Sequence, residues 1–382
     1  MPRHALLSVL VLLLLISSGC SLKRSVPGGE SAPGVSLFRP LSEYGAFPLS
    51  RDEAAGIAGK MLPDLRSGAS LNALAAALRR SASHVSAQPG GAVALQMPGL
   101  NLTYADLGAT LAQLISLLPE LSAHPELLAR DFQWFRIGPD FGFTGYYEPT
   151  LRAAREKSAA YPYPLYRVPP DLRKGAPYHT RKAIDRKGVL AGRGLEIAWV
   201  DSETEAFFLH IQGSGRLLFA DGSVRHVLYA DKNNRAYVPI GRVLRDRGIL
   251  EPDAVNMNSI RAWIQANPEK RADLFDENPS YVFFRLAEQG PVGAMGSVLT
   301  PYVSAATDRT VLPFGLTLFS ILPLPDDAGR ANRPFHSLLL PQDRGGAIRG
   351  RRVDLFCGAE SNAAHTAGYL NSKGAVYILV KK

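Results

Sequence analysis

The sequence has little cysteine and lacks the motifs of several common catalytic and cofactor sites. Its two cysteines, Cys20 and Cys357, are too few for a disulfide framework. The eight histidines are scattered, and no pair has the HxxxH or HxxEH spacing of a zinc site. No phosphate-binding GK[ST] loop, dinucleotide fingerprint or nucleophilic GxSxG motif occurs. We therefore expect no metal and no other cofactor.

Long apolar runs are also scarce, and the one at residues 5–16 is too short for a comfortable membrane span. It follows Arg3 and precedes small residues and Cys20, a pattern that resembles a bacterial lipobox. We predict a signal peptide over residues 1–19, lipidation of Cys20, and a tether rich in Ser, Pro and Gly over residues 20–49. A soluble secreted protein with an unused cysteine is the alternative.

The net charge of +9 at pH 7 favours an anionic partner, such as a wall polymer or lipid headgroups. Nucleic acid would satisfy charge alone, but the export signal argues against it. Ser21 follows Cys20 where inner-membrane lipoproteins typically have aspartate. In a Gram-negative cell, this points to a lipid anchor in the outer membrane, on its periplasmic side.

The first part of the body has helical patterns. Ser50 and Glu53 form a capping-box pattern that predicts a helix to about Leu65. Thr103 and Asp106 repeat the pattern, and leucines at helical spacing follow them. The segment before residue 130 is therefore predicted to be mostly α-helical.

Beyond that segment, short β-type runs dominate. "LEIAWV", "EAFFLHIQG", "GRLLFA" and "SVRHVLYA" have the length of strands, and Asp221-Gly222 predicts a tight type I′ hairpin between the last two. Two helical patterns follow within residues 240–275, and β-type runs return from Tyr281 to the end. We predict a mainly β fold with a helical N-terminal layer and a second, smaller β unit in the middle.

Two glycine-rich motifs combine aromatic, hydroxyl and amide side chains of the kind that bind sugars. They are "TGYYEP" and "HIQGSGR", and their candidate substrate-binding residues are Thr144, Tyr146, Tyr147, Gln212, Gly213 and Ser214. Aromatic clusters are more often core, and the second motif could be only a turn, so both interpretations stay open.

Asp354 is the acidic residue with the most unusual position, because it lies inside an apolar stretch that reads as a strand. A carboxylate there is costly unless it is paired or used in chemistry. Asp308 and Asp343 lie beside similar β-type runs. A single aspartate in a turn is usually a cap or a solvated charge.

The chain resembles a known family at these residues. "TDRTVLPFGLTLF" and "PQDRGGAIRGRRVDLFCG" resemble the three-aspartate "3D" domain, whose acids match Asp308, Asp343 and Asp354. With "GFTGYYEP", "FFLHIQGSGRL" and "MGSVLTPY" upstream, most of residues 130–382 is similar to the membrane-bound lytic transglycosylase A family. Two positions depart from the family pattern: Glu148 stands where threonine is frequent, and Cys357 replaces an aromatic residue.

The resemblance implies a double-psi β-barrel main domain over residues 50–149 and 286–382, with a second small β-barrel inserted at 150–285. A groove between them would take a peptidoglycan glycan strand. The implied reaction cleaves the MurNAc–GlcNAc β-1,4 bond without water and leaves a 1,6-anhydromuramyl end. Asp354 matches the catalytic acid and Asp343 a supporting acid, with Asp308 a weaker supporting candidate, while Thr144 and Gln212 fall in motifs that line the groove.

One carboxyl group is enough for this reaction, because the sugar's own C6 hydroxyl is the nucleophile. That group must be protonated near neutral pH, although an ordinary aspartate has a pKa of about 3.9. Burial or a nearby carboxylate would raise the pKa of Asp354, and an adjacent guanidinium would lower it. We therefore predict that Arg349, Arg351 and Arg352 point away from Asp354 or bind substrate carboxylates.

Two other functions are compatible with the same residues. A non-catalytic wall-binding lipoprotein would tolerate loss of Asp354 but not of the aromatic residues. A conventional glycoside hydrolase would need a second essential carboxylate, with Glu148 or Asp343 as candidates. The expected partners are glycan strands and, through the lipid, a membrane; proteins of wall synthesis or division are further potential partners.

Overall fold

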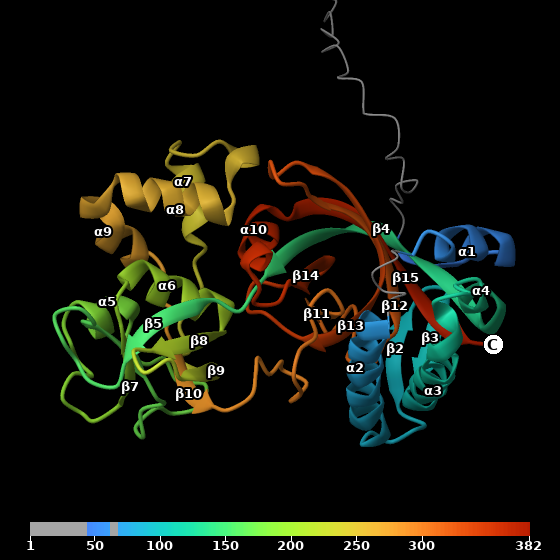
Figure 1. Ribbon diagram of the computed structural model, residues 1–382, viewed down its shortest axis with the longest axis horizontal. Coiled ribbons are helices and arrows are strands. Elements are labelled where there is room, and N and C mark those ends of the chain that lie inside the picture. Colours follow the sequence, from blue (N-terminus) through green and yellow to red (C-terminus); the bar gives the residue numbers. More distant parts are fainter. Residues whose placement is uncertain (1–43, 62–67) are drawn as a thin grey trace, which may run out of the picture. The chain divides into compact units, whose positions relative to one another are not determined.

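Six β-strands close into a barrel in the computed structural model, which describes residues 44–61 and 68–382 (Figure 1). The barrel order is β4-β14-β11-β13-β12-β15, and β15 pairs with β4 to close the ring. Two neighbouring pairs are parallel, β4 with β14 and β11 with β13. The predicted signal peptide, Cys20 and residues 20–43 of the predicted tether lie outside the described residues.

The barrel strands come from two separate parts of the chain, residues 132–146 and 304–381, as the green β4 beside the red β15 shows in Figure 1. Their bounds are β4 Phe132–Tyr146, β11 Ser304–Thr307, β12 Leu318–Pro325, β13 Ala331–Asp343, β14 Arg352–Phe356 and β15 Asn371–Lys381. A short strand, β1 Gly45–Pro48, pairs with β4, and helix α10 Ser361–Tyr369 connects β14 to β15. The fold is therefore mainly β with a closed six-stranded barrel, as expected.

In the part of the chain that the structure describes, four helices and a hairpin precede β4, in addition to β1. They are α1 Arg51–Ala58, α2 Gly68–Ser86, α3 Tyr104–Leu121 and α4 Leu127–Asp131, with β2 Val93–Met97 and β3 Leu100–Thr103. The two predicted capping boxes, at Ser50 and Thr103, are both present. The prediction that the first helix reaches about Leu65 is wrong, because α1 ends at Ala58 and Gly59 caps it. No helix in the described residues is long and apolar enough to cross a membrane.

One apolar cluster joins the barrel interior to these helices. The predicted apolar face of α3 is buried: Leu107, Leu111, Leu114 and Leu118. Trp134 on β4 is fully buried in the same cluster, and its indole N–H donates to the Leu128 carbonyl at 3.0 Å. The strand that carries Thr144 therefore begins in a tightly packed core.

The chain between β4 and β11 forms a second sheet of order β10-β9-β8-β5-β7-β6. Its strands are β5 Thr150–Ala154, β6 Tyr163–Tyr166, β7 Glu196–Val200, β8 Ser214–Phe219, β9 Val224–Lys232 and β10 Val282–Ala287. Its helices are α5 Arg181–Asp185, α6 Glu203–Gln212, α7 Ile240–Asp246, α8 Met257–Ala266 and α9 Arg271–Asp276. We call residues 150–285 the insert, and the last two residues of β10 lie just beyond it.

Two predictions in the insert are wrong. "EAFFLHIQG" is helix α6 rather than a strand, because Ser202 caps its start and Gly213, with φ of 82°, ends it. Its apolar residues pack into two different hydrophobic clusters on different sides of the helix. The apolar run is therefore not interrupted by the polar residues that mark a helix with one buried face. The hairpin of β8 and β9 is present, but Phe219 and Ser223 bond across a longer loop in which only Gly222 has positive φ. A type I′ turn needs positive φ at two residues.

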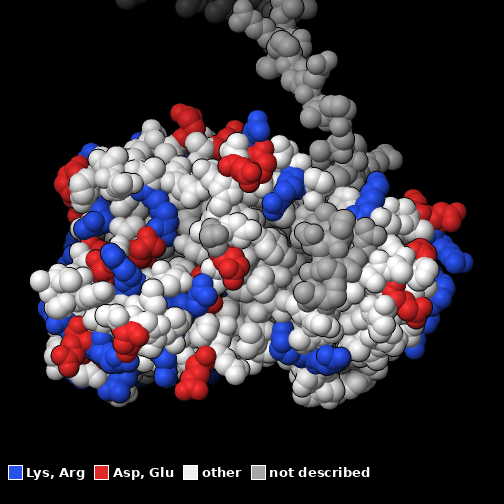
Figure 2. All heavy atoms as spheres, in the orientation of Figure 1, with Lys and Arg blue, Asp and Glu red and all other residues white. Residues whose placement is uncertain are grey.

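Charged side chains of both signs are interspersed on the face drawn in Figure 2. They do not gather there into one large patch of a single sign, despite the net charge of +9. Recognition of an anionic polymer on this face would therefore depend on local arrangements of charge rather than on one broad basic surface.

Candidate active site

Asp354 lies in the middle of β14, between two barrel strands. It is opposite Thr144 on β4 and opposite Ala306 on β11. The Thr144 hydroxyl donates to Asp354 Oδ1 at 2.5 Å. Burial raises the pKa of Asp354 above its ordinary value, while the Thr144 hydrogen bond and the charge of Arg352 oppose the rise. The net effect favours the protonated carboxyl group, which is the form a general acid needs.

Arg352 approaches this carboxyl group through Thr144. Its Nε donates to Thr144 Oγ1 at 3.1 Å, so the threonine hydroxyl lies between the guanidinium and the carboxyl group. Arg352 therefore does not point away from the site, and the other form of the prediction, that it binds a substrate carboxylate, stays a prediction. No ion pair joins Arg352 to Asp354 among the described residues, and its charge lowers the pKa of Asp354 less than burial raises it.

Asp343, at the end of β13, is tightly held. Tyr146 donates its hydroxyl to Oδ2 at 2.9 Å, and the backbone N–H groups of Ala294 and Arg344 donate to Oδ1, each at 2.8 Å. Burial nevertheless raises the pKa of Asp343. Its negative charge also raises the pKa of Asp354. The two carboxyl groups are therefore electrostatically coupled. Each accepts from one side-chain hydroxyl group, and of the two only Asp343 also accepts from backbone N–H groups.

Asp308 follows β11 and organises a turn. Its Oδ2 accepts from the Gly350 N–H at 2.8 Å, and its Oδ1 accepts from both the backbone and the hydroxyl of Thr310. The hydrogen bond from Gly350 is the main reason why the pKa of Asp308 is lowered. Asp308 has no hydrogen bond to Asp354 in the described part of the chain. Its hydrogen bond from Gly350 instead connects the start of the loop after β11 to the residues just before β14.

Tyr146 and Tyr147 are buried rather than presented as open platforms. The Tyr146 ring packs with Phe356 at a centroid distance of 5.3 Å, and burial raises the pKa of its hydroxyl well above the ordinary value. The Tyr147 N–H donates to Gln212 Oε1 at 3.0 Å, and its hydroxyl accepts from Arg261 at 3.3 Å. These contacts give both tyrosines a defined position.

Gln212, Gly213 and Ser214 connect α6 to β8, and all three are partly exposed. Gly213 adopts the left-handed conformation that ends α6, a conformation that a residue with a side chain rarely adopts. The Gln212 side chain binds the Tyr147 backbone through Oε1, so the predicted glycine-rich motif meets the "TGYYEP" motif in the structure.

Two features of the site were not predicted. Tyr237 lies near Asp354: burial raises its pKa, with the charge of Asp354 adding to the rise and Arg352 opposing it. Glu148, a departure from the family pattern, is buried and its Oε1 lies 2.7 Å from His226 Nδ1. Neither contact has a short-range signal in the sequence. In the described residues, no group of three or more His, Cys, Asp or Glu side chains is arranged to hold a metal.

Comparison with known proteins places this geometry in a wider context. Residues 142–285 match the family model "MltA specific insert domain", and residues 303–380 match "3D domain". A membrane-bound lytic murein transglycosylase from Agrobacterium tumefaciens is 31% identical and aligns over 88% of this chain and 98% of that one, with a TM-score of 0.73. E. coli MltA with bound chitohexaose aligns over 81% of this chain and 90% of that one, at 29% identity and a TM-score of 0.66.

The curated membrane-bound lytic murein transglycosylase A of E. coli K12 is 37% identical over 241 residues. The alignment covers 62% of this chain and 65% of that protein. The fold and site define a class: a β-barrel interrupted by an insert, with one carboxyl group whose pKa is raised by burial and which accepts from a hydroxyl group. Within this class, the chain belongs to the membrane-bound lytic murein transglycosylase A family.

Proposed function

We propose that the protein is a lytic transglycosylase that cleaves the MurNAc–GlcNAc β-1,4 bond of peptidoglycan and leaves 1,6-anhydromuramyl ends. The observation that carries the proposal is the state of Asp354. Its pKa is raised by burial, it receives a hydrogen bond from Thr144, and Asp343 disfavours its ionisation. A carboxyl group in such surroundings can stay protonated at neutral pH and give its proton to a leaving oxygen.

Asp354 would act first as an acid and then as a base. Its proton passes to the glycosidic oxygen as the bond from that oxygen to C1 breaks, which releases the GlcNAc hydroxyl. The carboxylate then takes the proton of the C6 hydroxyl as O6 bonds to C1, which forms the anhydro ring and restores the neutral acid. No water is consumed, and an intramolecular nucleophile has a high effective concentration.

The surroundings favour one acting carboxyl group over a pair. A hydrolase of the usual kind needs a second carboxylate free to activate water or attack the sugar. Both oxygens of Asp343 are occupied by Tyr146 and two backbone N–H groups. The Glu148 carboxylate is buried against His226. We assign Asp343 a supporting role, in which its charge keeps Asp354 protonated, and Asp308 a weaker one through the turn before β14.

The proposed substrate is a glycan strand, and the solved structure of a relative, E. coli MltA with bound chitohexaose, supports a ligand of this type. Thr144, Tyr146, Tyr147, Gln212, Gly213 and Ser214 are the proposed substrate-binding residues. We further propose domain boundaries of 50–149 with 286–382 for the main domain and 150–285 for the insert. A lipid on Cys20 would hold the protein on the periplasmic side of the outer membrane, where wall-synthesis or division proteins could meet it.

The test is mass spectrometry of peptidoglycan sacculi digested by the purified protein, beside the Asp354→Asn variant. We expect anhydromuropeptides from the parent protein and a loss of roughly 100-fold or more in their rate of release from the variant. Asp326→Asn is the matched control. Asp326 has a lowered pKa and lies in an exposed turn, so its variant should keep full activity.

Each alternative function gives a different result. Products with reducing ends would show hydrolysis and contradict the proposed reaction. Binding to sacculi without release of any product from the parent protein would favour the wall-binding lipoprotein. Equal activity of the Asp354→Asn variant and its parent would leave the reaction intact but remove Asp354 as the acid.

A further inference from the structure

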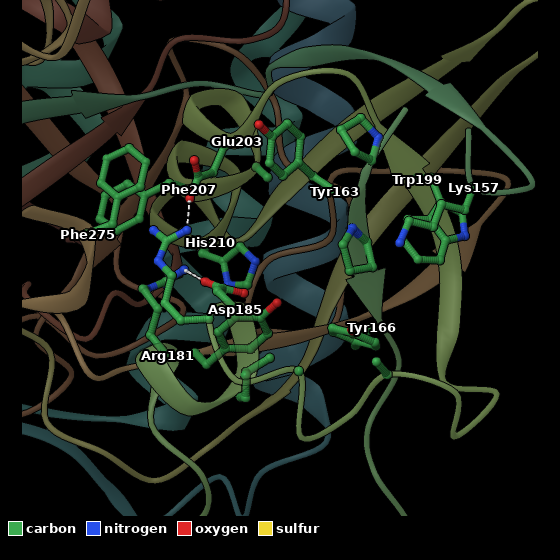
Figure 3. A pocket seen from close by; sticks show the side chains of 18 residues that line it. Lys157, Tyr163, Tyr166, Arg181, Asp185, Trp199, Glu203, Phe207, His210 and Phe275 are labelled. Atoms are coloured by element: carbon green, nitrogen blue, oxygen red, sulfur yellow. Dashed lines mark hydrogen bonds and ion pairs between the residues drawn. The ribbon is translucent and has the colours of Figure 1, made fainter. Parts of the chain in front are cut away.

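The insert contains a cavity of about 280 Å³ that includes none of the proposed site residues (Figure 3). β6 and β7 supply one part of its lining, and α5 and α6 supply another. This volume is near the lower limit of about 300 Å³ for small-molecule sites. It suits a ligand the size of one sugar residue better than a long polymer.

Aromatic and proline rings form much of the cavity lining. Tyr163, Tyr166 and Trp199 project from the sheet, and Pro164 pairs with Trp199 across β6 and β7. Tyr163 and Trp199 are only partly buried, so part of the surface of each side chain is accessible to a ligand. The Lys157 amino group lies 5.4 Å from the centre of the Trp199 ring. Flat apolar surfaces of this kind pack against the C–H faces of sugar rings.

Four charged groups of the lining are paired with one another, and the fifth, Lys157, lies over the Trp199 ring. Arg181 Nη1 lies 3.4 Å from Asp185 Oδ2, and Arg186 Nη1 lies 2.6 Å from Glu203 Oε1, as the dashed lines in Figure 3 show. A ligand ammonium bound to either carboxylate would be repelled by the guanidinium beside it. A ligand carboxylate bound to either guanidinium would likewise be repelled by the neighbouring acidic side chain. Paired charges therefore favour a neutral ligand with many hydrogen-bonding groups.

Asp185 and His210 can supply hydrogen bonds to such a ligand. The Asp185 side chain keeps 26% of its surface exposed, and burial raises the pKa of its carboxyl group. His210 Nδ1 accepts from the Val282 N–H at 3.2 Å, so a neutral ring carries its proton on Nε2. Burial holds the pKa of His210 well below its usual range, which keeps the ring neutral. No described residue accepts the Nε2 proton.

We propose that this cavity is a second saccharide site, which takes one neutral N-acetylated sugar residue at a position separate from Asp354. The choice of an N-acetylated sugar rests on the proposed function, whereas the neutral polyhydroxy class rests on the lining itself. A structural ion network alone would need no aromatic-walled space beside it. With this site, the insert would bind a glycan independently of the residues around Asp354.

The first test needs no variant in the cavity. The sequence has three tryptophans, Trp134, Trp199 and Trp263, so the indole N–H region of a ¹H–¹⁵N spectrum has few signals. The full-length Asp354→Asn protein is titrated with N,N′-diacetylchitobiose, and Trp199→Phe in the same background assigns the Trp199 signal. We expect this signal to shift in a saturable way, while that of the fully buried Trp134 stays in place.

The second test uses calorimetry with matched variants. Tyr163→Ala should weaken binding at this site by roughly tenfold or more, and Tyr163→Phe should keep most of it because the ring remains. Tyr229→Ala is the control, since Tyr229 is 46% exposed on β9 and does not line the cavity. The Trp199 signal remains a valid readout even where Tyr163→Ala fails to fold.

Two results would overturn the proposal. One is a Trp199 signal that does not move while chitobiose binds elsewhere or not at all. The other is a shift caused by D-alanyl-D-alanine, a zwitterion, and not by the sugar. Neither readout requires cleavage, so a protein that binds sugar here but releases no anhydromuropeptide would fail only the proposed function.

Discussion

At the scale of single residues, Asp354 is stabilised in its neutral form by its position. Burial penalises the carboxylate, and Asp343 repels it, while the Thr144 hydroxyl and the Arg352 charge favour it. Burial is the largest of these effects, so the folded protein binds the proton more tightly than the unfolded chain does. The same property that would make Asp354 an acid therefore has a cost in stability at neutral pH.

We predict that Asp354→Asn is more stable than the parent protein above neutral pH. The folded-state pKa is raised, so stability from this group is present below the unfolded value of about 3.9 and is lost as pH rises through the folded value. Asparagine has no such loss. Urea unfolding at several pH values should show a difference that grows with pH up to the folded pKa. A variant less stable than its parent at pH 8 would contradict the inferred direction of the shift.

Arg352 gives a second prediction at this scale. Arg352→Gln removes a positive charge that lowers the pKa of Asp354, so that pKa should rise further. The alkaline limb of the profile of kcat/KM against pH should then move to higher pH, because the acid stays protonated longer.

Arg351→Gln is the matched control for this change, because Arg351 is exposed and is the preceding residue. It should leave the alkaline limb in place. If Arg352→Gln leaves the alkaline limb unmoved, or moves it to lower pH, the positive charge of Arg352 is not what lowers the pKa of Asp354.

At the scale of elements, the close packing of α10 on β4 determines where Thr144 lies. A Cβ added at Gly145 would come within 2.8 Å of Ala367 Cα on α10 and 3.1 Å of Cys357 Sγ. The first contact is with backbone, which cannot rotate away. Glycine is therefore required at the position next to Thr144 because of this close approach rather than because of an unusual φ.

We predict that Gly145→Ala lowers the free energy of unfolding by about 1–3 kcal/mol, the usual range for an overpacked core. Gly142→Ala, on the same strand, is the control, because its Cβ would approach nothing closer than 3.9 Å. Urea denaturation of both variants measures the difference. Equal midpoints for the two would mean that α10 moves without resistance.

Elements with their own local signals could be predicted from the sequence. The capping boxes at Ser50 and Thr103 each satisfy backbone groups within three residues, so the sequence alone contains the whole interaction. The prediction of a strand at α6 was wrong because the apolar residues of this helix pack into two separate hydrophobic clusters. The sequence of the helix alone shows neither cluster. Tertiary contacts determined that element, not its pattern.

The candidate site shows the same division. Asp354 and Asp343 could be proposed from the sequence because their motif lies in one short stretch. Arg352 was expected to point away or to bind a substrate carboxylate, since the sequence does not say that Thr144 would lie between it and the carboxyl group of Asp354. Tyr237 was missed for a similar reason: its relation to Asp354 is purely spatial.

At the scale of the whole molecule, the site unites two distant parts of the chain. Thr144 precedes the insert and Asp354 follows it, at a separation of 210 positions, and they pair directly across parallel strands. The barrel cannot form its β4–β14 pair until the whole insert has been synthesised. Contacts of such long range are slow to form, because loop closure must precede them.

The predicted anchor gives the last prediction, which concerns where the whole protein resides. A lipid on Cys20 would hold it to a membrane, since each buried CH₂ group of an acyl chain contributes about 0.8 kcal/mol. Cys20→Ser leaves the apolar run at residues 5–16 unchanged but removes the thiol that would carry the lipid. We expect the parent protein in the outer-membrane fraction and the variant in the soluble periplasmic fraction, as cell fractionation with immunoblotting would measure.

Cys357→Ser is the control, because this buried thiol is not the predicted lipid site and its loss should leave the distribution unchanged. A Cys20→Ser protein that stays with the outer membrane would mean that contacts of the folded body, and not a lipid, hold the protein there.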